Sequence, residues 1–442
     1  MEDAMPVNWS IEADWETLEG APAEENACFA ALGICVNGHW LTEGHDYLAN
    51  RLRTKPYLSA YHLAEWLAWN WWRLRWEPRS AASEWGQSHN LSSIGEGYIW
   101  PNINIFSDGE RTALISEPTD ERPATPFRYI SSYAAVMPSG QFEAGLDEFF
   151  LQVLNRLDAE GVKATNFHSI WSSLKEERAS SSLTMRRRLE ALLGVDPDEG
   201  DTAFIDRLVH DADDVSLPAI EEIAANRGDR GLQLTVQDLK QVAQSSGFEL
   251  AAKNAVRLHD RSGLHPSGSI PAWLIGARAA QALRDQEKIG GGPISDKTLT
   301  EMAGASETVL KTDQQGTVGF AFAIDDERDK GHLVLRSKWL NGRRFELARV
   351  IGDRLMASSA NKLFPATKAH TYRQKMQRAF AAELLSPFNE VEEALNGDYS
   401  AENQSDVAQY FNVSELTIRT LLVNHHRIPR DKIDGDFDSA AA

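Results

Sequence analysis

Apolar and polar residues follow two different periods along the chain, and the first change comes near residue 144. In the first part, residues 29–36 are almost entirely apolar and are followed by Asn37-Gly38, a dipeptide typical of a hairpin turn. Residues 102–105 alternate asparagine with isoleucine and lead to Asp108-Gly109, which predicts a half-buried strand and a turn. The pattern predicts an α+β domain over residues 1–142.

From residue 144 onward, apolar residues recur every three or four positions, which is typical of amphipathic helices. This spacing predicts a helical middle region over residues 143–265 and a helix over 271–288 that ends before three glycines. Further strands and helices fall within 266–430, the next predicted domain, and the acidic stretch 431–442 is predicted to be disordered. The expected fold is α+β, in a mainly helical multidomain protein with a tryptophan-rich N-terminal region.

Length and composition are those of a protein with large hydrophobic cores. The 442 residues are 42% hydrophobic and 25% charged, and no apolar run reaches the length of about 18 residues that spans a membrane. Residues 1–6 lack the apolar core of a signal peptide. The two cysteines, Cys28 and Cys35, are typical of a chain kept in a reducing compartment. We therefore expect a cytoplasmic protein with no membrane association.

Positive charge is concentrated in one stretch of an acidic chain. The net charge is −20, and its field repels phosphate groups, which argues against nucleic-acid binding by the whole surface. Residues 336–378, hereafter the basic island, contain eleven lysines and arginines and two acidic residues, a net charge of +9. The basic island is therefore the candidate surface for nucleic-acid binding.

Possible metal ligands occur in three places, and none has a recognised spacing. The first place comprises Cys28, Cys35, His39 and His45. This set matches no common zinc pattern, and the cysteines lie in an apolar run. Residues 210–214 and 259–265 combine histidine with aspartate, but they fall at helix ends or in loops, where solvated polar residues are common. No metal site and no cofactor are predicted.

The N-terminal region offers two candidate functional features. The stretch 57–76 is predicted to be a helix whose second face carries Trp69, Trp72 and Trp76. This helix is either buried on two sides or presents an aromatic surface for stacking or for a partner. A polar cluster follows it, and nothing in its order marks an acid, a base or a nucleophile. The cluster comprises His89, Glu96, Asn102, Asn104 and Asp108.

The stretch 343–388 carries the most specific motif. Two strands are followed by a basic loop, a helix over 345–355 and then Ala-Phe-Ala-Ala-Glu-Leu-Leu-Ser-Pro at 379–387, with a small helical unit around 407–423. This order resembles the ImmA/IrrE family of zinc metallopeptidase-like proteins over about residues 270–430. The resemblance implies a short zincin-type catalytic domain that cleaves regulators, often beside helix-turn-helix proteins.

The same resemblance implies an Ala-His-Glu-x-Gly-His helix, in which two histidines bind zinc and the glutamate activates water. Aligned on the alanine and the glycine, the histidines fall on Arg349 and Asp353, and the glutamate falls on Val350. A third, acidic ligand is implied shortly before the Phe-Ala-Ala run, but residues 372–378 contain no carboxylate. We therefore expect a degenerate zincin-like domain that holds no metal and is not catalytic.

Two interpretations of the replaced site are open. Arg349 and Asp353 stand four residues apart, so they can form an ion pair in a fold that kept its packing and lost its chemistry. Alternatively, basic residues form an anion-binding face for nucleic acid, a nucleotide or an acidic protein segment. That face comprises Arg343, Arg344, Arg349, Arg373, Lys375 and Arg378.

Residues 405–423 have the pattern of a helix-turn-helix, with Ser405 and Ser414 as expected caps. The second helix offers a leading glutamate and a single arginine, Arg419, which is poor chemistry for a DNA major groove. This unit is therefore expected to pack against the zincin-like domain rather than to read DNA.

Three functional hypotheses follow. The first is a non-catalytic regulatory or interaction protein with a protein partner, for which the resemblance implies a bacterial toxin–antitoxin, mobile-element or phage-defence setting. The second is a nucleic-acid-binding regulator that uses the basic island. The third is an enzyme with a site in the N-terminal region.

Overall fold

The computed structural model describes residues 8–120, 125–226, 234–312, 316–326, 330–358 and 360–429. Helices account for about 50% of the fold and strands for 16%, and the strands form several small antiparallel sheets, which confirms the expected α+β class. None of the described helices is long and apolar enough to cross a membrane. The stretch 431–442, predicted to be disordered, lies outside the described residues.

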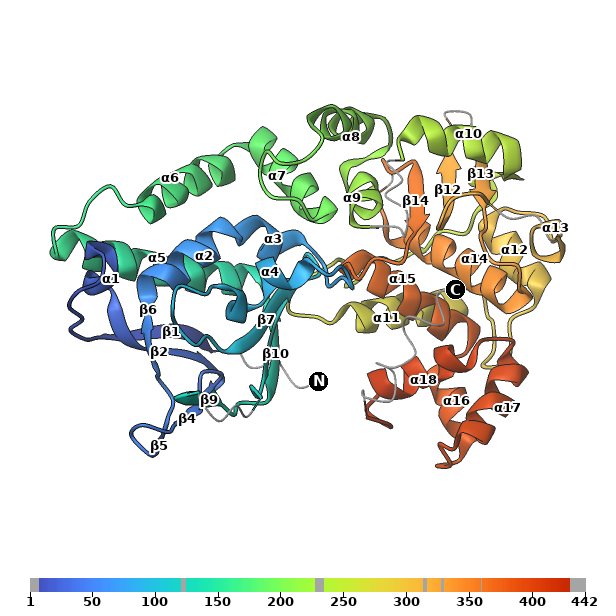
Figure 1. The fold of residues 1–442 in the computed structure, drawn as a ribbon. Coiled ribbons are helices and arrows are strands. Elements are labelled where there is room, and N and C mark those ends of the chain that lie inside the picture. Colours follow the sequence, from blue (N-terminus) through green and yellow to red (C-terminus); the bar gives the residue numbers. More distant parts are fainter. Residues whose placement is uncertain are drawn as a thin grey trace. The chain divides into compact units, whose positions relative to one another are not determined.

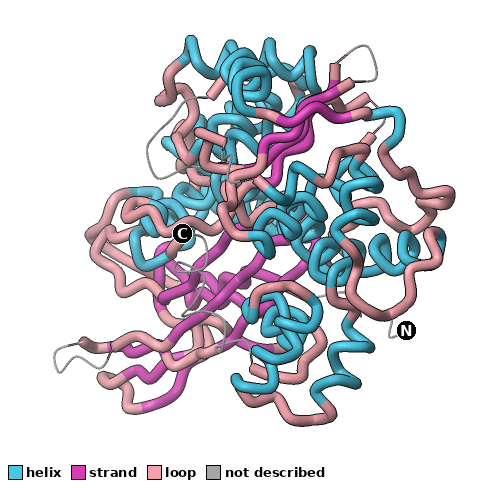
Figure 2. Tube along the Cα trace, turned by 90° about the vertical axis from the view of Figure 1, so that its right-hand side faces the viewer, coloured by secondary structure: helices cyan, strands magenta, loops and turns pink. Residues whose placement is uncertain are grey.

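The chain forms two compact units, each with its own hydrophobic core. Unit 1 contains Met1–Thr202 and Ser267–Ser269, and unit 2 contains Ala203–Pro266 and Ile270–Ala442. The predicted domain boundary at 142/143 falls inside a long helix, and the predicted helical region 143–265 is divided between the two units. Figure 1 follows the chain from blue to red, and Figure 2 shows its strands in separate groups bordered by helices.

Three antiparallel sheets form the β part of unit 1. Their orders are β1-β2-β3 with β6 paired to β2, β10-β8-β7, and β5-β4-β9. Both predicted hairpin turns are confirmed, because β2 leads through Asn37-Gly38 into β3, and β7 pairs with β8 across Asp108-Gly109. The strands are β1 (Trp9–Trp15), β2 (Phe29–Val36), β3 (His39–Trp40), β4 (Gly44–Asp46), β5 (Arg51–Arg53), β6 (Tyr57–Ser59), β7 (Asn102–Ser107), β8 (Arg111–Glu117), β9 (Phe127–Tyr129) and β10 (Tyr133–Pro138).

Helices cover these sheets. The expected single helix over 57–76 is wrong, because the segment begins as β6 and Ser59 caps the helix that follows. That helix ends at Trp69, and the side-chain amide of the next residue, Asn70, donates to the Trp66 carbonyl. A long helix continues the core because Phe142, Leu146 and other apolar residues line one side of it. The helices are α1 (Ala23–Ala27), α2 (Ala60–Trp69), α3 (Trp71–Trp76), α4 (Trp85–His89), α5 (Ser139–Ala159), α6 (Asn166–Ala179) and α7 (Ser181–Leu193).

Unit 2 contains one four-stranded antiparallel sheet in the order β11-β13-β12-β14. Its strands are β11 (Phe248–Leu250), β12 (Ala321–Asp325), β13 (Gly331–Val334) and β14 (Leu363–Ala366). The helices of this unit are α8 (Thr202–Val215), α9 (Leu217–Ala225), α10 (Val236–Ser246), α11 (Ala272–Gln286), α12 (Asp296–Ala303), α13 (Thr308–Lys311), α14 (Leu340–Met356), α15 (Tyr372–Leu385), α16 (Phe388–Leu395), α17 (Ala401–Phe411) and α18 (Glu415–Asn424).

Helices α11, α14 and α15 form the centre of this unit. Helix α15 packs closely against α11 on one side and against α14 on another, and α14 also contacts β14. The predicted helix-turn-helix corresponds to α17 and α18, which pack on each other, and α18 also packs on α15. Ser414 caps α18 as predicted, but α17 begins earlier than expected, because Ser400 rather than Ser405 caps it.

Candidate functional site

Helix α14, which carries the residues singled out by the resemblance, is buried around most of its circumference. Its buried residues include four ionisable side chains between Arg343 and Arg349, and Asp353 further along the helix. A buried charge is costly unless it is paired and hydrogen-bonded, so these side chains need partners inside the protein. Those partners define the candidate site.

Asp353 on α14 is paired with Arg373 on α15. The Arg373 guanidinium donates from Nε to Oδ1 and from Nη2 to Oδ2, at 2.7 Å in both cases. Asp353 is only 2% exposed, so the pair is bidentate and buried. The predicted ion pair between Arg349 and Asp353 is therefore wrong in its partner, because Arg373 takes both oxygens of the carboxylate.

Arg349 turns instead toward the segment that links β14 to α15. Its Nη2 donates to the Thr367 carbonyl at 2.7 Å and to the Gln374 side-chain oxygen. Arg378 donates to the same Thr367 carbonyl at 3.3 Å, so two guanidinium groups meet at one oxygen. Burial, and then the charge of Arg378, lowers the pKa of Arg349 to about 9. Burial lowers the pKa of Arg378 to about 10.

Two glutamines fix this end of α15 to the sheet. The side-chain amides of Gln374 and Gln377 both donate to the Pro365 carbonyl of β14 at 3.0 Å. Gln374 also accepts from the Thr367 amide at 2.9 Å through its side-chain oxygen. Amide and guanidinium hydrogen bonds thus connect α14, β14 and α15.

Helix α9 contributes a carboxylate to the same network. Glu222 is 5% exposed and accepts a 2.7 Å hydrogen bond from the hydroxyl of Thr371, the residue that caps α15. Burial raises the pKa of Glu222, although the Arg373 charge and the Thr371 hydrogen bond oppose that rise. Sequence reasoning missed Glu222. Its spacing of three residues from the buried Ala219 would have placed it on the inner side of α9.

The basic island does not form a single face. Arg343 is 1% exposed and donates to the Val309 and Ser337 carbonyls. Arg344 is 2% exposed, donates to the Ile294 carbonyl at 2.8 Å and is paired with Asp296. These two arginines fix the first turns of α14 to its neighbours, away from the Arg349 network. Of the predicted anion-binding residues, Arg349, Arg373 and Arg378 are brought together. Lys375, on the same helix as Arg373 and Arg378, is half-buried like them.

Of the two interpretations of the tryptophan face in unit 1, burial is correct for Trp72 and the aromatic surface is wrong for it. Trp72 is 3% exposed, and its indole nitrogen donates to Glu177 at 2.6 Å. Trp76 is covered by two guanidinium groups, those of Arg75 and Arg188, at 3.9 and 3.6 Å from the ring centre. Trp69 alone of the three is exposed, at 54%. Trp72 is therefore buried, and Trp76 is half-buried under guanidinium groups from α3 and α7.

The predicted polar cluster of unit 1 is not assembled around one point. His89 is fully buried, with Nδ1 at 2.7 Å from the Ile105 carbonyl and Nε2 at 3.0 Å from Glu77 Oε2. Both ring nitrogens face acceptors, so neither can serve as a base toward a substrate. Asn102 and Asn104 each accept a hydrogen bond from the side-chain amide of Asn90. Asp108 accepts a hydrogen bond from the Arg111 backbone N–H across its own turn. Glu96 is exposed in another turn.

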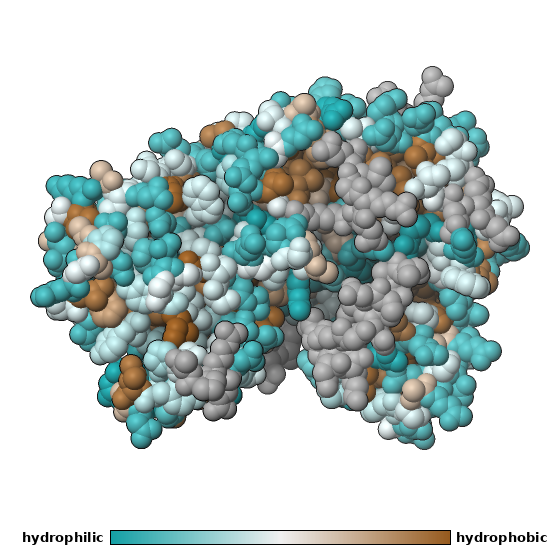
Figure 3. Space-filling model, viewed as in Figure 1, coloured by the Kyte–Doolittle hydropathy of each residue, from teal (hydrophilic) through white to brown (hydrophobic). Residues whose placement is uncertain are grey.

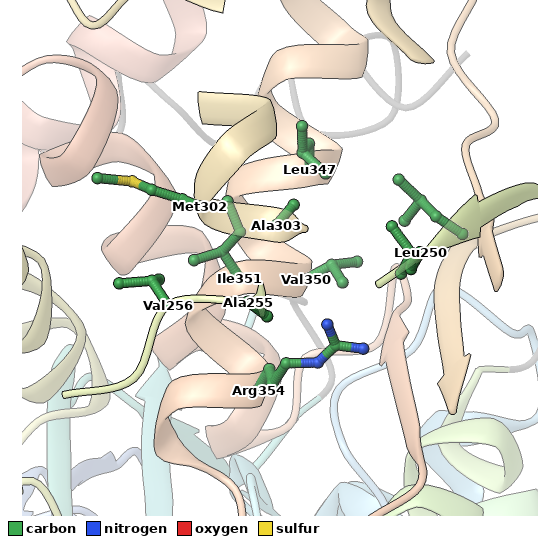
Figure 4. A pocket seen from close by; sticks show the side chains of 10 residues that line it. Leu250, Ala255, Val256, Met302, Ala303, Leu347, Val350, Ile351 and Arg354 are labelled. Atoms are coloured by element: carbon green, nitrogen blue, oxygen red, sulfur yellow. The ribbon is translucent and has the colours of Figure 1, made fainter. Parts of the chain in front are cut away.

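Two hollows lie beside α14. The first is an apolar cavity of about 10 Å³, room for at most one water, and Figure 4 shows Leu347, Val350 and Ile351 of α14 around it with Arg354 at its edge. The second is an open hollow of about 330 Å³ at the first turn of α14, lined by Leu340, Arg344 and neighbouring residues. The network of Arg349 and Asp353 lies in neither hollow.

The side chains of Arg349, Asp353 and Arg373 suit hydrogen bonding rather than zinc binding. A protonated guanidinium has no lone pair for a metal, and both oxygens of the Asp353 carboxylate accept hydrogen bonds from Arg373. Within the described ranges, no group of three or more histidine, cysteine, aspartate or glutamate side chains is placed to hold a metal ion.

Comparison of the chain with family models, with curated proteins and with solved structures found no match.

Proposed function

We propose that this chain is a non-catalytic protein with a degenerate, ImmA/IrrE-like zincin domain, and that it works by binding a protein partner. The observation that carries the proposal is the buried pair of Asp353 and Arg373. Asp353 occupies the position that the resemblance gives to the second zinc-binding histidine. Arg373 lies on the helix to which the resemblance gives the third, acidic ligand.

The order of elements supports this proposal. The sheet strands β12 and β13 precede α14, and β14 and then α15 follow it, in line with the strand, helix and second helix that the resemblance implies. In a zincin the metal joins the two helices, whereas here an ion pair and a set of hydrogen bonds join them. The positive charges of Arg349, Arg373 and Arg378 would also repel a divalent cation.

Stability alone is a weak reason to retain such a network. Desolvation of a buried ion pair often cancels its Coulomb attraction, and apolar residues of similar size can replace it without loss. A network of this kind does hold two helices in one arrangement. We propose that the arrangement supports a binding surface, in a regulatory, toxin–antitoxin, mobile-element or phage-defence setting in the bacterial cytoplasm.

No specific observation favours the alternatives. A nucleic-acid interface on the basic island would need its arginines at the surface, but Arg343, Arg344 and Arg349 are buried. An enzyme site around His89 would need a free ring nitrogen, and both nitrogens face acceptors.

Affinity purification of the tagged chain from its host tests the proposal. We expect one protein to co-purify in fixed stoichiometry and to form the same complex when both chains are purified separately and mixed. Mass spectrometry of the mixture should show the partner intact, because no catalytic group is present at the zincin positions. Cleavage of the partner that requires zinc and is abolished by a chelator would overturn the proposal.

A further inference from the structure

Ser216, at the junction of α8 and α9, has a backbone conformation that is rare for a residue with a side chain. Its φ is 130° and its ψ is 145°, close to the region that only glycine occupies readily. The other non-glycine residues with positive φ in the described ranges lie between 47° and 64°, in the ordinary left-handed region. The junction is therefore strained, and contacts elsewhere on α9 must hold it in this conformation.

The side chain of Ser216 does not offset this strain. A serine that precedes a helix usually accepts a hydrogen bond from the first turn, as Ser295 does from the Thr298 backbone N–H at 3.0 Å. Ser216 makes no such bond to α9. Its hydroxyl oxygen is buried and has no hydrogen-bond partner in the described part of the chain. Burial of an unpaired hydroxyl adds a further cost to this arrangement.

Two hydrogen bonds tie α9 to the segment that leads from β14 into α15. Glu222 accepts from the Thr371 hydroxyl at 2.7 Å, and the Asn226 side-chain oxygen accepts from the Lys368 backbone N–H at 3.1 Å. Figure 1 shows α9 beside β14, which it also contacts. The strained junction is thus kept in place by bonds to the end of β14 and the start of α15.

The apolar side of α9 favours this closed position. Ala219 and Ile220 are fully buried, and Ile223 is 8% exposed, so opening of α9 would bring all three into contact with water. The face drawn in Figure 3 is mainly hydrophilic, with hydrophobic residues scattered over it. Hydrophobic burial therefore opposes the strain at Ser216, and the closed position predominates over an open minor state.

We infer that α9 is a latch, whose closed position strains Ser216 and whose open position relieves that strain and uncovers the first turn of α15. Opening withdraws the Glu222 carboxylate from Thr371, so it changes the hydrogen-bond network between α14 and α15. Locally unstable elements of this kind are the ones that move in switching proteins. The inference goes beyond the proposed function and does not depend on a partner.

Hydrogen exchange of the full-length chain, followed by peptide mass spectrometry, tests the latch. We expect the amides of α9 to exchange faster than those of α11. Ser216→Gly relieves the strain without opening, so it should slow exchange in α9 by about three- to thirtyfold and leave α11 unchanged. Asn226→Ala removes one of the two hydrogen bonds and should speed exchange in α9 but not in α11.

Ser295→Gly is the matched control. Ser295 also precedes a helix, but its φ is −72° and its side chain caps α12, so glycine there should leave exchange in α12 unchanged or make it faster. The latch would be overturned by α9 amides that exchange no faster than those of α11. It would equally be overturned if Ser216→Gly failed to slow exchange in α9, or if Asn226→Ala accelerated α9 and α11 alike.

Discussion

Asp353 and Arg373 meet across α14 and α15 in a bidentate ion pair, with both donor–acceptor distances at 2.7 Å. Neither charge has ready access to solvent, because Asp353 is 2% exposed and the Arg373 side chain is 14% exposed. The attraction of Asp353 raises the pKa of Arg373 against the opposing effect of burial. Each charge therefore stabilises the other in the interior, and we expect removal of either side chain to destabilise the fold strongly.

Replacing Asp353 by alanine leaves the Arg373 guanidinium buried without its counter-ion. We expect a loss of about 3–5 kcal/mol in the free energy of unfolding, measured by urea denaturation followed by far-UV circular dichroism. The double variant Asp353→Leu/Arg373→Met removes both charges and should lose less than the single variant. A double variant that is less stable than Asp353→Ala would show that the pair is not the cause.

The approach of α11 to α15 depends on a missing side chain. A Cβ atom on Gly276 would lie 2.2 Å from the Met376 carbonyl oxygen and 2.8 Å from the Phe380 nitrogen, both backbone atoms that cannot move aside cheaply. We expect Gly276→Ala to destabilise the protein by about 1–3 kcal/mol, measured by thermal unfolding.

Gly140 supplies the control for that change. It lies in the first turn of α5, and a Cβ atom there would meet nothing within 4 Å. Gly140→Ala should therefore be neutral or stabilising by up to about 1 kcal/mol. Equal effects of the two substitutions would contradict the close packing of α11 and α15.

Glu77 gives unit 1 a defined response to acid. Burial alone would raise the pKa of Glu77, but hydrogen bonds and charges from His89 and Arg73 outweigh burial and lower it. A lowered pKa stabilises the fold above the pKa of the unfolded carboxyl, and this stabilisation is lost as the pH falls through the folded value. We expect melting temperatures measured between about pH 6 and pH 3 to fall less steeply in Glu77→Gln than in the natural chain.

Comparing the natural chain with Glu77→Gln isolates the effect of the Glu77 carboxyl group on the melting temperature. Other carboxyl groups with a lowered pKa, such as those of Asp46 and Asp198, are present in both proteins. Glu77→Gln should also be less stable at neutral pH, since Arg73 and His89 lose their charged acceptor. Parallel pH profiles would refute the assigned role of the carboxylate.

The two thiols should differ in reactivity. Cys28 is fully buried, and burial raises the pKa of its thiol to about 12, so almost no thiolate forms near neutral pH. Cys35 is partly exposed. Alkylation with iodoacetamide, followed by peptide mass spectrometry, should modify Cys35 well before Cys28 in the folded chain and both at similar rates in urea. Preferential modification of Cys28 in the folded chain would contradict its burial.

Local signals predicted local structure well. The turns at Asn37-Gly38 and Asp108-Gly109 need only the backbone preferences of those residues, and both hairpins are present. The alternation of residues 102–105 likewise gave the half-buried strand β7. The expected helix over 57–76 failed at its start, because the pairing of β6 with β2 overrides the helical spacing of residues 57–59.

The contacts of the candidate site could not be predicted from the sequence, because they join residues that lie far apart along the chain. Spacing on one helix suggested Arg349 as the partner of Asp353, but Arg373 reaches it from another helix that lies twenty residues further along the chain. The charge count of the basic island gave no sign that Arg343, Arg344 and Arg349 are buried, since burial depends on the elements that pack around α14. Glu222 enters the network from α9, far away in sequence.

Zinc analysis of the purified chain tests the central claim most directly. After dialysis against zinc and removal of the excess, inductively coupled plasma mass spectrometry should find no stoichiometric zinc, and the melting temperature should not change on addition of zinc or a chelator. Stoichiometric zinc that is lost in Asp353→Ala would contradict the account, because it would show that the helix occupied by Arg349 and Asp353 still holds a metal.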